Sequence, residues 1–195
     1  MRIDPMHAAA LAANAGVLNV CGVRAQSTSE HIAMPSTVAR AVLAAWLTAM
    51  SVVVAIGSQH LPGMVASHFA ANGHANGWMP RSAYIGVMLV LVLALPVVIA
   101  WAPTRQLRAK AVRMSADDPA DVARITSVNF CVFSAGVAAF LAYVNTLVVA
   151  ANTHAPPLLD MRALTTAAMM FVVFAVGWGT LFVRRLQRAR SVEQM

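Results

Sequence analysis

Long apolar stretches alternate along this chain with short polar ones. No Asp, Glu, Lys or Arg occurs in four intervals, which are residues 41–80, 82–104, 125–159 and 163–183. Each interval holds a run of about 20 mainly apolar residues, the length that an α-helix needs to cross the hydrocarbon core of a bilayer. The pattern therefore predicts four membrane-spanning helices, at residues 38–57, 83–101, 128–151 and 164–183.

The apolar runs are continuous, whereas the strands of a membrane β-barrel alternate between apolar and polar residues. A spanning helix also satisfies its backbone hydrogen bonds within itself, as the bilayer core requires. The predicted fold class is an all-α integral membrane protein with a four-transmembrane-helix bundle. This membrane domain covers residues 36–190, and residues 191–195 form a short tail.

Composition supports the same class. Hydrophobic residues make up 59% of the chain and charged residues 11%, with a mean hydropathy of +0.69. Soluble domains are about one quarter charged, so the apolar surface of this chain requires lipid as a second solvent.

Basic residues gather on one side of the predicted spans. Of the fourteen Lys and Arg residues, only Arg81 and Arg162 lie in the first and third connections between spans. Because short cytoplasmic loops carry the excess of Lys and Arg, we predict that both termini are cytoplasmic. The net charge of +7 then reflects topology and attraction to anionic lipid headgroups, and we predict no nucleic-acid partner.

The first 35 residues differ from the rest. An Ala-rich stretch is interrupted by Asn14 and Asn19 and is followed by a polar segment. We predict a disordered N-terminal extension over residues 1–35, with Met34 a natural starting point. A removable targeting peptide, with Val23–Ala25 as a poor cleavage site, stays open as the alternative.

The connection between the first two spans, residues 61–81, is rich in Gly, Asn and His. Residues 65–69 are compatible with a short strand, residues 71–74 with a turn, and Asn76-Gly77 is a second turn signal. We therefore predict a short extracytoplasmic hairpin between the first and second helices.

Particular side chains have predicted roles in this hairpin. Gly73 and Gly77 are expected to adopt the positive φ values that tight turns require. Phe69 and Trp78 are expected to pack the hairpin on the membrane surface, and Arg81 is expected to begin the second helix.

The order of residues in this loop resembles a known family. The shared positions are Leu61-Pro62, Val65, His68-Phe69, Gly73 and Asn76-Gly77-Trp78, followed by a polar residue and an apolar span. They resemble a bacterial domain-of-unknown-function membrane family, whose domain also forms the N-terminal part of SdpI-like immunity proteins. Such proteins protect cells against a secreted peptide toxin and take part in its signalling. Asn76 stands where many relatives have Asp.

The candidate binding residues follow from the loop and from this resemblance. They are His68, Phe69, Gly73, Asn76, Gly77, Trp78 and Arg81. An alternative is a metal site or pH sensor built from the histidines predicted to lie outside, because histidine is the commonest metal ligand. These are His60, His68, His74 and His154. They lack close spacing, so we predict no metal and no other cofactor.

No motif joins a nucleophile, a base and an oxyanion site, so we predict that the protein is not an enzyme. Two functions remain. The first is a non-catalytic multi-pass inner-membrane protein whose 61–81 loop binds a peptide or a membrane-protein partner, in a regulatory, immunity or envelope role. The second is a small permeation or transport-associated protein. The expected partners are membrane lipids, a peptide or membrane protein, and further copies of the chain.

Overall fold

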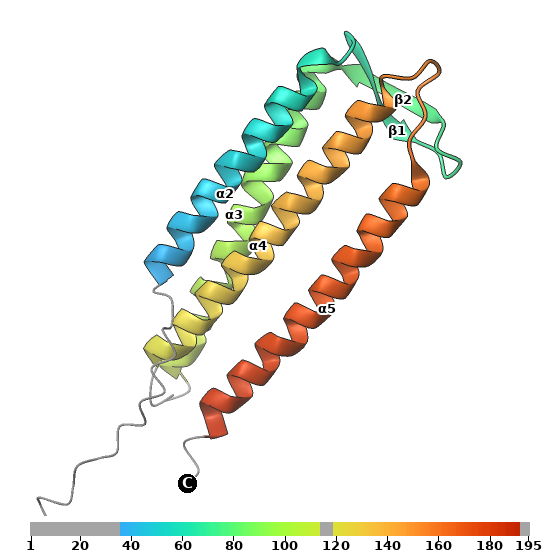
Figure 1. The fold of residues 1–195 in the computed structure, drawn as a ribbon. Helices are drawn as coiled ribbons and strands as arrows, with labels where there is room; N and C mark the ends of the chain where they lie inside the picture. Colours follow the sequence, from blue (N-terminus) through green and yellow to red (C-terminus); the bar gives the residue numbers. More distant parts are fainter. Residues whose placement is uncertain (1–35, 114–118, 192–195) are drawn as a thin grey trace, which may run out of the picture. The chain divides into compact units, whose positions relative to one another are not determined.

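The computed structural model describes residues 36–113 and 119–191. The predictions for residues 1–35 and 192–195 therefore lie outside the described residues. The elements shown in Figure 1 are, in chain order, α2 (Ser36–Gly57), the single 3-10 turn η1 (Ser58–His60), β1 (Met64–Phe69), β2 (Ala75–Pro80), α3 (Arg81–Arg113), α4 (Pro119–Ala151) and α5 (Met161–Ser191).

The predicted four-helix membrane fold is confirmed. Four helical segments in the described part of the chain are long and apolar enough to cross a bilayer, and they are Ser36–His60, Arg81–Trp101, Ala123–Ala151 and Met161–Gln187. Helices α3 and α4 continue well beyond the hydrocarbon length at their shared end, where the sequence turns polar. Helix propensity and backbone hydrogen bonding continue past the bilayer surface. The helices are therefore longer than the apolar runs from which they were predicted.

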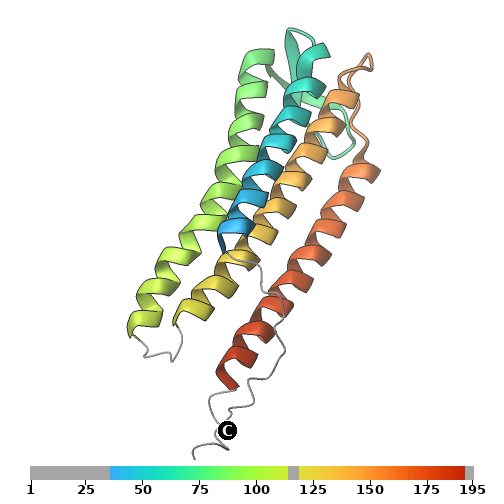
Figure 2. The ribbon, with the colours of Figure 1, turned by 60° about the vertical axis from the view of Figure 1, so that its left-hand side comes forward.

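Helix α4 is the centre of the bundle. It packs against α2 and α3 along their lengths and more loosely against α5, which stands beside it in both views (Figures 1 and 2). One apolar cluster, which includes Val54, Val92 and Val148, fills the bundle near the hairpin, and a second, around Leu43, Cys131 and Ala138, fills it farther along.

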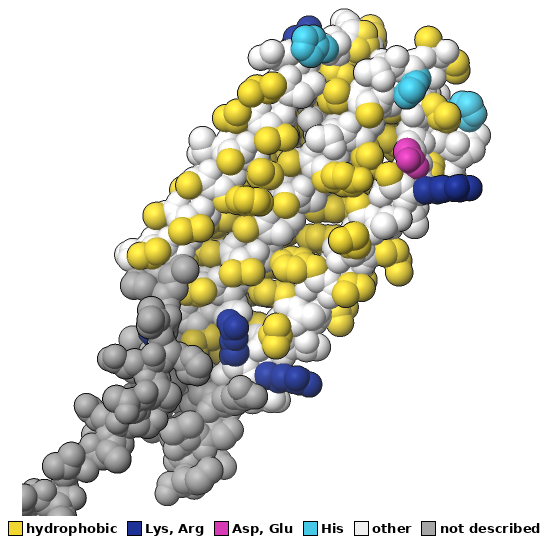
Figure 3. Space-filling view, in the orientation of Figure 1, with side chains coloured by type: hydrophobic (Ala, Val, Ile, Leu, Met, Phe, Trp, Pro, Cys, Tyr) yellow, Lys and Arg dark blue, Asp and Glu magenta, His cyan; other side chains and the backbone are white. Residues whose placement is uncertain are grey.

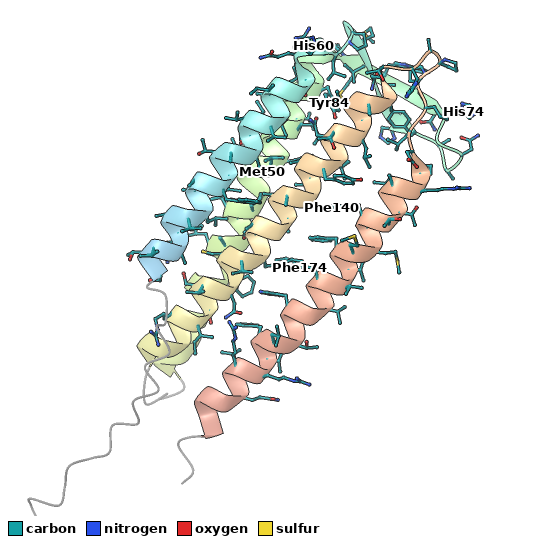
Figure 4. All side chains as sticks on the ribbon, in the orientation of Figure 1. Met50, His60, His74, Tyr84, Phe140 and Phe174 are labelled. Atoms are coloured by element: carbon teal, nitrogen blue, oxygen red, sulfur yellow. The ribbon has the colours of Figure 1, made fainter. Side chains whose placement is uncertain are left out.

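Aromatic side chains fill the space between α4 and α5. They are Phe130, Phe133 and Phe140 on α4, and Phe171, Phe174, Trp178 and Phe182 on α5, in stacked and edge-to-face pairs. Phe140 and Phe174 both point into this space (Figure 4). Gly136 lets the Phe174 ring lie directly against α4, because a Cβ at this position would overlap the ring. Helix α5 is thus held by bulky rings rather than by close backbone approach.

Apolar side chains cover the outside of the bundle between its two ends. On α5, for example, Met170 and Val173 are each 69% exposed, and no residue in the spanning window of this helix is fully buried. Figure 3 shows the hydrophobic band between the charged side chains of the two ends. Contiguous apolar surface of this extent is unusual for a protein in water and fits burial in lipid.

Candidate functional site at the hairpin end

Strands β1 and β2 form an antiparallel hairpin at the end of the bundle where α4 joins α5 (Figure 1). We refer to residues 61–81 together with residues 152–160 as the hairpin end. The strands are joined by a tight turn in which the Gly73 N–H donates to the Ala70 carbonyl at 2.8 Å and the Ala70 N–H to the His74 carbonyl at 2.9 Å. Gly73 has a φ of 84°, which confirms its predicted conformation.

The prediction for Asn76-Gly77 was wrong. Both residues lie inside β2, and Gly73 is the only glycine with positive φ among the described residues. The turn at residues 70–74 already reverses the chain, so no second turn is needed. Gly77 instead lies opposite His68 where the strand register is irregular, and a Cβ there would come within 2.8 Å of the His68 Cβ. Glycine at this position permits close contact between the strands.

Asn152 holds β1 against the end of α4. Its amide Oδ1 accepts the Ala66 N–H at 2.8 Å, and its Nδ2 donates to the Ala66 carbonyl at 3.0 Å and to the Val148 carbonyl at 2.9 Å. The Asn152 amide therefore makes the two hydrogen bonds to Ala66 that the backbone of a neighbouring strand would make. Ala66 is fully buried, so these bonds satisfy backbone groups that water does not reach.

The turn of the hairpin is joined to the connection between α4 and α5. The Leu159 N–H donates to the Gly73 carbonyl at 2.9 Å, and His74 and Leu158 form an isolated antiparallel bridge. Asp160 then begins α5, because its Oδ1 accepts the N–H groups of Arg162 and Ala163 at 3.0 and 3.1 Å. This is N-terminal capping of a helix by a carboxylate, which also suits the helix dipole.

A buried polar group lies beneath the hairpin. The Tyr84 hydroxyl donates to the Asn145 Oδ1 at 2.9 Å, which joins α3 to α4. Both side chains are buried, and Tyr84 lies among the side chains near the hairpin end (Figure 4). The Asn145 Nδ2 and the Ser58 Oγ have no hydrogen-bond partner among the described residues. This polar contact fixes the register of the helices that carry the hairpin.

The seven candidate binding residues separate into two groups. Phe69, Gly73, Gly77 and Arg81 are at least partly buried and form part of the hairpin itself. The Arg81 N–H donates to the Gly63 carbonyl at 3.0 Å, and its Nη1 approaches the Leu61 carbonyl at 3.4 Å.

The second group is exposed. His68, Asn76 and Trp78 lie on the surface of the hairpin, with Trp78 53% exposed beside Met64 at 57%. These side chains are therefore available to a partner, and the first group holds them in place. Phe69 contacts the apolar cluster near the hairpin, whereas the packing of Phe69 and Trp78 on the membrane surface stays a prediction.

The histidine alternative receives no support from the geometry. His60, His68, His74 and His154 are all exposed, and His60 and His74 lie well apart in Figure 4. Within residues 36–113 and 119–191, no three His, Cys, Asp or Glu side chains come together as a metal site.

Sequence analysis missed Asn152 and Asp160 as elements of the site. Asp160 had a local signal, because an Asp directly before an apolar helix is a typical N-cap. Asn152 had none, since its partner Ala66 is 86 residues away in the chain.

Comparison with known proteins identifies the segment that carries the hairpin. Residues 45–99 match the family model described as Domain of unknown function (DUF1648). The match runs from α2 through both strands into α3. No curated protein and no solved structure matches the chain. The helix–hairpin–helix unit at residues 45–99 is thus the part for which the comparisons support a domain-of-unknown-function family.

Proposed function

We propose that this is a non-catalytic membrane protein whose hairpin is a recognition surface for a peptide or a membrane-protein partner. One observation carries the proposal: the hairpin is bonded to α4 through Asn152, yet Trp78, His68 and Asn76 remain exposed. A rigid strand that presents an exposed aromatic side chain loses little conformational entropy on binding. Exposed Trp residues are also enriched among the residues that dominate binding energy at interfaces.

The proposed setting is the inner membrane of a bacterium, with both termini in the cytoplasm and the hairpin outside. The excess of Lys and Arg on the other side of the spans supports this orientation. The resemblance to the domain found in SdpI-like proteins supports a regulatory, immunity or envelope role in which an external peptide or a neighbouring membrane protein is recognised.

The orientation predicts a labelling pattern. A cysteine introduced at Asn72, in the exposed turn of the hairpin, is expected to react with a membrane-impermeant thiol reagent applied to intact cells whose outer barrier is permeable to it. A cysteine at Ser115, between α3 and α4, is expected to react only after lysis. The background is a variant lacking both native cysteines. Labelling in the reverse order would place the hairpin inside and contradict the proposed setting.

The recognition proposal predicts position-specific crosslinking. A photoreactive amino acid at Trp78 is expected to form an adduct with one defined polypeptide in living cells, at a yield that saturates with expression of that polypeptide. The same amino acid at Val173, which is 69% exposed on the apolar side of α5, serves as the matched control. It is expected to give lipid adducts alone, because that side chain faces hydrocarbon.

The crosslinked polypeptide must then bind the purified full-length protein, and Trp78→Ala must weaken that binding. A loss of about 2 kcal/mol, or about thirtyfold in Kd, is expected for an aromatic residue at the centre of an interface. If Trp78 gives the same lipid adducts as Val173, then Trp78 is only an interfacial anchor and the recognition proposal fails.

A further inference from the structure

Helix α5 carries two adjacent arginines at the end of the bundle opposite the hairpin. Arg184 and Arg185 lie in the last turn of the membrane-spanning segment Met161–Gln187. Arg side chains at such a position reach the headgroup layer of the bilayer. No Asp or Glu occurs at residues 161–192, and Figure 3 shows basic side chains at this end next to the hydrophobic band. At this level α5 itself therefore contributes only positive charge.

The two arginines point to different sides of α5. Successive residues of a helix are about 100° apart around its axis. Arg185 follows Trp178 by two turns and lies on the side that faces α4, where its Nη1 donates to the Asn129 Oδ1 at 3.3 Å. Arg184 lies with Val173 on the exposed side, and it makes no hydrogen bond or ion pair in the described part of the chain. Of the two, only Arg185 therefore has a position set by another helix.

Asn129 sets that position from inside the bundle. It is 5% exposed, and its Nδ2 donates to the Ile125 carbonyl at 2.7 Å, so its amide is turned with the Oδ1 toward Arg185. Its backbone carbonyl accepts the Trp178 Nε1–H at 2.9 Å, which joins α5 to the same residue a second time. The Trp178 ring is stacked on Phe133, with centroids 4.5 Å apart. The guanidinium is thus positioned by a buried residue whose own amide is bonded at both ends.

The bond to Asn129 uses only a small part of the Arg185 guanidinium. A guanidinium has five N–H donors and a full positive charge. One donor is used on an uncharged amide oxygen, so four donors and the whole charge have no counterpart among the described residues. Two N–H groups on one edge match two oxygens of a phosphate, and such pairs are commonly bidentate. An arginine held in this way is prepared to bind one phosphate group.

The surroundings of Arg185 favour a lipid phosphate over a soluble anion. One turn earlier, Leu181 is 54% exposed within the membrane-spanning segment, where an acyl chain covers it. All Lys and Arg except Arg81 and Arg162, and all Asp and Glu except Asp160, belong to the polar segments on this side of the spans, which gives twelve basic residues against six acidic ones. This excess favours a headgroup with a net negative charge, the kind that basic pockets between membrane helices bind.

We propose that Arg185, positioned by Asn129, binds the phosphate of one anionic phospholipid at the junction of α4 and α5. The guanidinium donates two hydrogen bonds to two phosphate oxygens, and an acyl chain of the same lipid lies along α5 beside Leu181. The site is at the other end of the spans from the hairpin, so it does not depend on the proposed recognition function. It differs from general attraction between basic residues and anionic membranes, because it assigns the lipid to Arg185 and not to Arg184.

Two single substitutions test the site against general charge attraction. The full-length protein is purified in a mild non-ionic detergent, and binding of dioleoyl-phosphatidylglycerol is measured by native mass spectrometry. Arg185→Gln and Arg184→Gln each remove one positive charge, from adjacent residues. Binding of the first lipid is expected to weaken about tenfold in Arg185→Gln and less than about twofold in Arg184→Gln. Both variants are expected to stay folded, since both arginines are exposed.

Further substitutions test the positioning of the guanidinium. Asn129→Leu removes the amide and keeps Arg185, while the backbone carbonyl still accepts the Trp178 bond. It is expected to weaken binding of the first lipid by about threefold or more, and to add less than about twofold to the effect of Arg185→Gln, because both substitutions remove one arrangement. Arg185→Lys makes a similar test without changing a buried residue. It keeps the charge, loses the bidentate geometry and is expected to weaken binding about threefold.

Two other probes test the identity of the ligand. Dioleoyl-phosphatidylcholine, whose headgroup has no net charge, is expected to bind the first site about tenfold more weakly than phosphatidylglycerol. Inorganic phosphate at about 10 mM is expected not to displace phosphatidylglycerol, because it has no acyl chain. Equal weakening by Arg184→Gln and Arg185→Gln, or equal binding of the two lipids, would show general adhesion to lipid. Displacement by inorganic phosphate would show a site for a soluble anion. Each of these three results would overturn the inference.

Discussion

Replacing Asn152 by Ala is expected to release the hairpin from α4 while the four helices stay folded. The substitution removes two hydrogen bonds to Ala66 and one to Val148. Because Ala66 is fully buried, its N–H and carbonyl lose their partners without gaining water. Loss of the two bonds to Ala66, together with the cost of leaving its buried backbone groups unsatisfied, is expected to lower the free energy of hairpin opening by about 2–4 kcal/mol. Amide exchange of β1 residues measures this loss directly.

Two matched variants show whether the amide group itself is responsible. Thr153→Ala changes the next residue, whose hydroxyl bonds only to the Ala150 carbonyl, and is expected to leave exchange in β1 unchanged. Asn152→Asp keeps an acceptor for the Ala66 N–H but places a carboxylate against two carbonyl oxygens. Asn152→Asp is therefore expected to accelerate amide exchange in β1 at least as much as Asn152→Ala. Equal protection of β1 in Asn152→Ala and Thr153→Ala would show that the hairpin is held by apolar packing alone.

The membrane architecture was predictable because it depends on local properties of the sequence. A continuous apolar run between charges indicates a helix in lipid, since a helix satisfies its backbone groups within one segment and the strands of a barrel would alternate. Each of the four spans accordingly lies within a helix of the structure. Gly73 was equally predictable, because its left-handed conformation is a property of one residue in one turn.

The attachment of the hairpin was not predictable in the same way. Asn152 acts on Ala66, and Leu159 on Gly73, across 86 residues in each case. A single sequence has no signal for such pairs, because an Asn directly after a helix is equally compatible with a helix end exposed to water. Asn76-Gly77 shows the opposite error. It is a strong local turn signal, but the strand pairing that includes Met79 and Val65 outweighs it.

These contacts indicate why the loop contains so many small and polar residues. Gly77 permits close contact of β2 with His68 on β1, and Gly73 permits close contact of the turn with Leu159. A larger residue would not fit at either position. The exposed positions of the loop, Asn76 and Trp78, make no such contacts. Substitutions in the loop should therefore fall into two classes, one that loosens the hairpin and one that changes binding while leaving it intact.

Gly73→Ala belongs to the first class and is expected to detach the hairpin from the connection between α4 and α5. The φ of 84° at Gly73 costs about 1–2 kcal/mol for a residue with a Cβ. A Cβ at this position would also lie 2.6 Å from the Leu159 carbonyl oxygen. The bond from the Leu159 N–H to the Gly73 carbonyl holds the two segments together at 2.9 Å, so the overlap is relieved only when that bond lengthens. The combined loss is expected to be about 2–4 kcal/mol.

Comparison with other substitutions separates backbone strain from steric overlap. Gly63→Ala is the matched control, because a Cβ at Gly63 meets nothing within 4 Å and no positive φ is involved. Asn tolerates the left-handed conformation better than Ala but also carries a Cβ. If overlap with Leu159 dominates, Gly73→Asn and Gly73→Ala will accelerate exchange of the Leu159 amide equally. If strain dominates, Asn will recover most of the protection. Unchanged Leu159 exchange in both variants would mean that Gly73 does not join the hairpin to the connection before α5, and that Asn152 and the apolar packing of β1 hold the recognition surface in place.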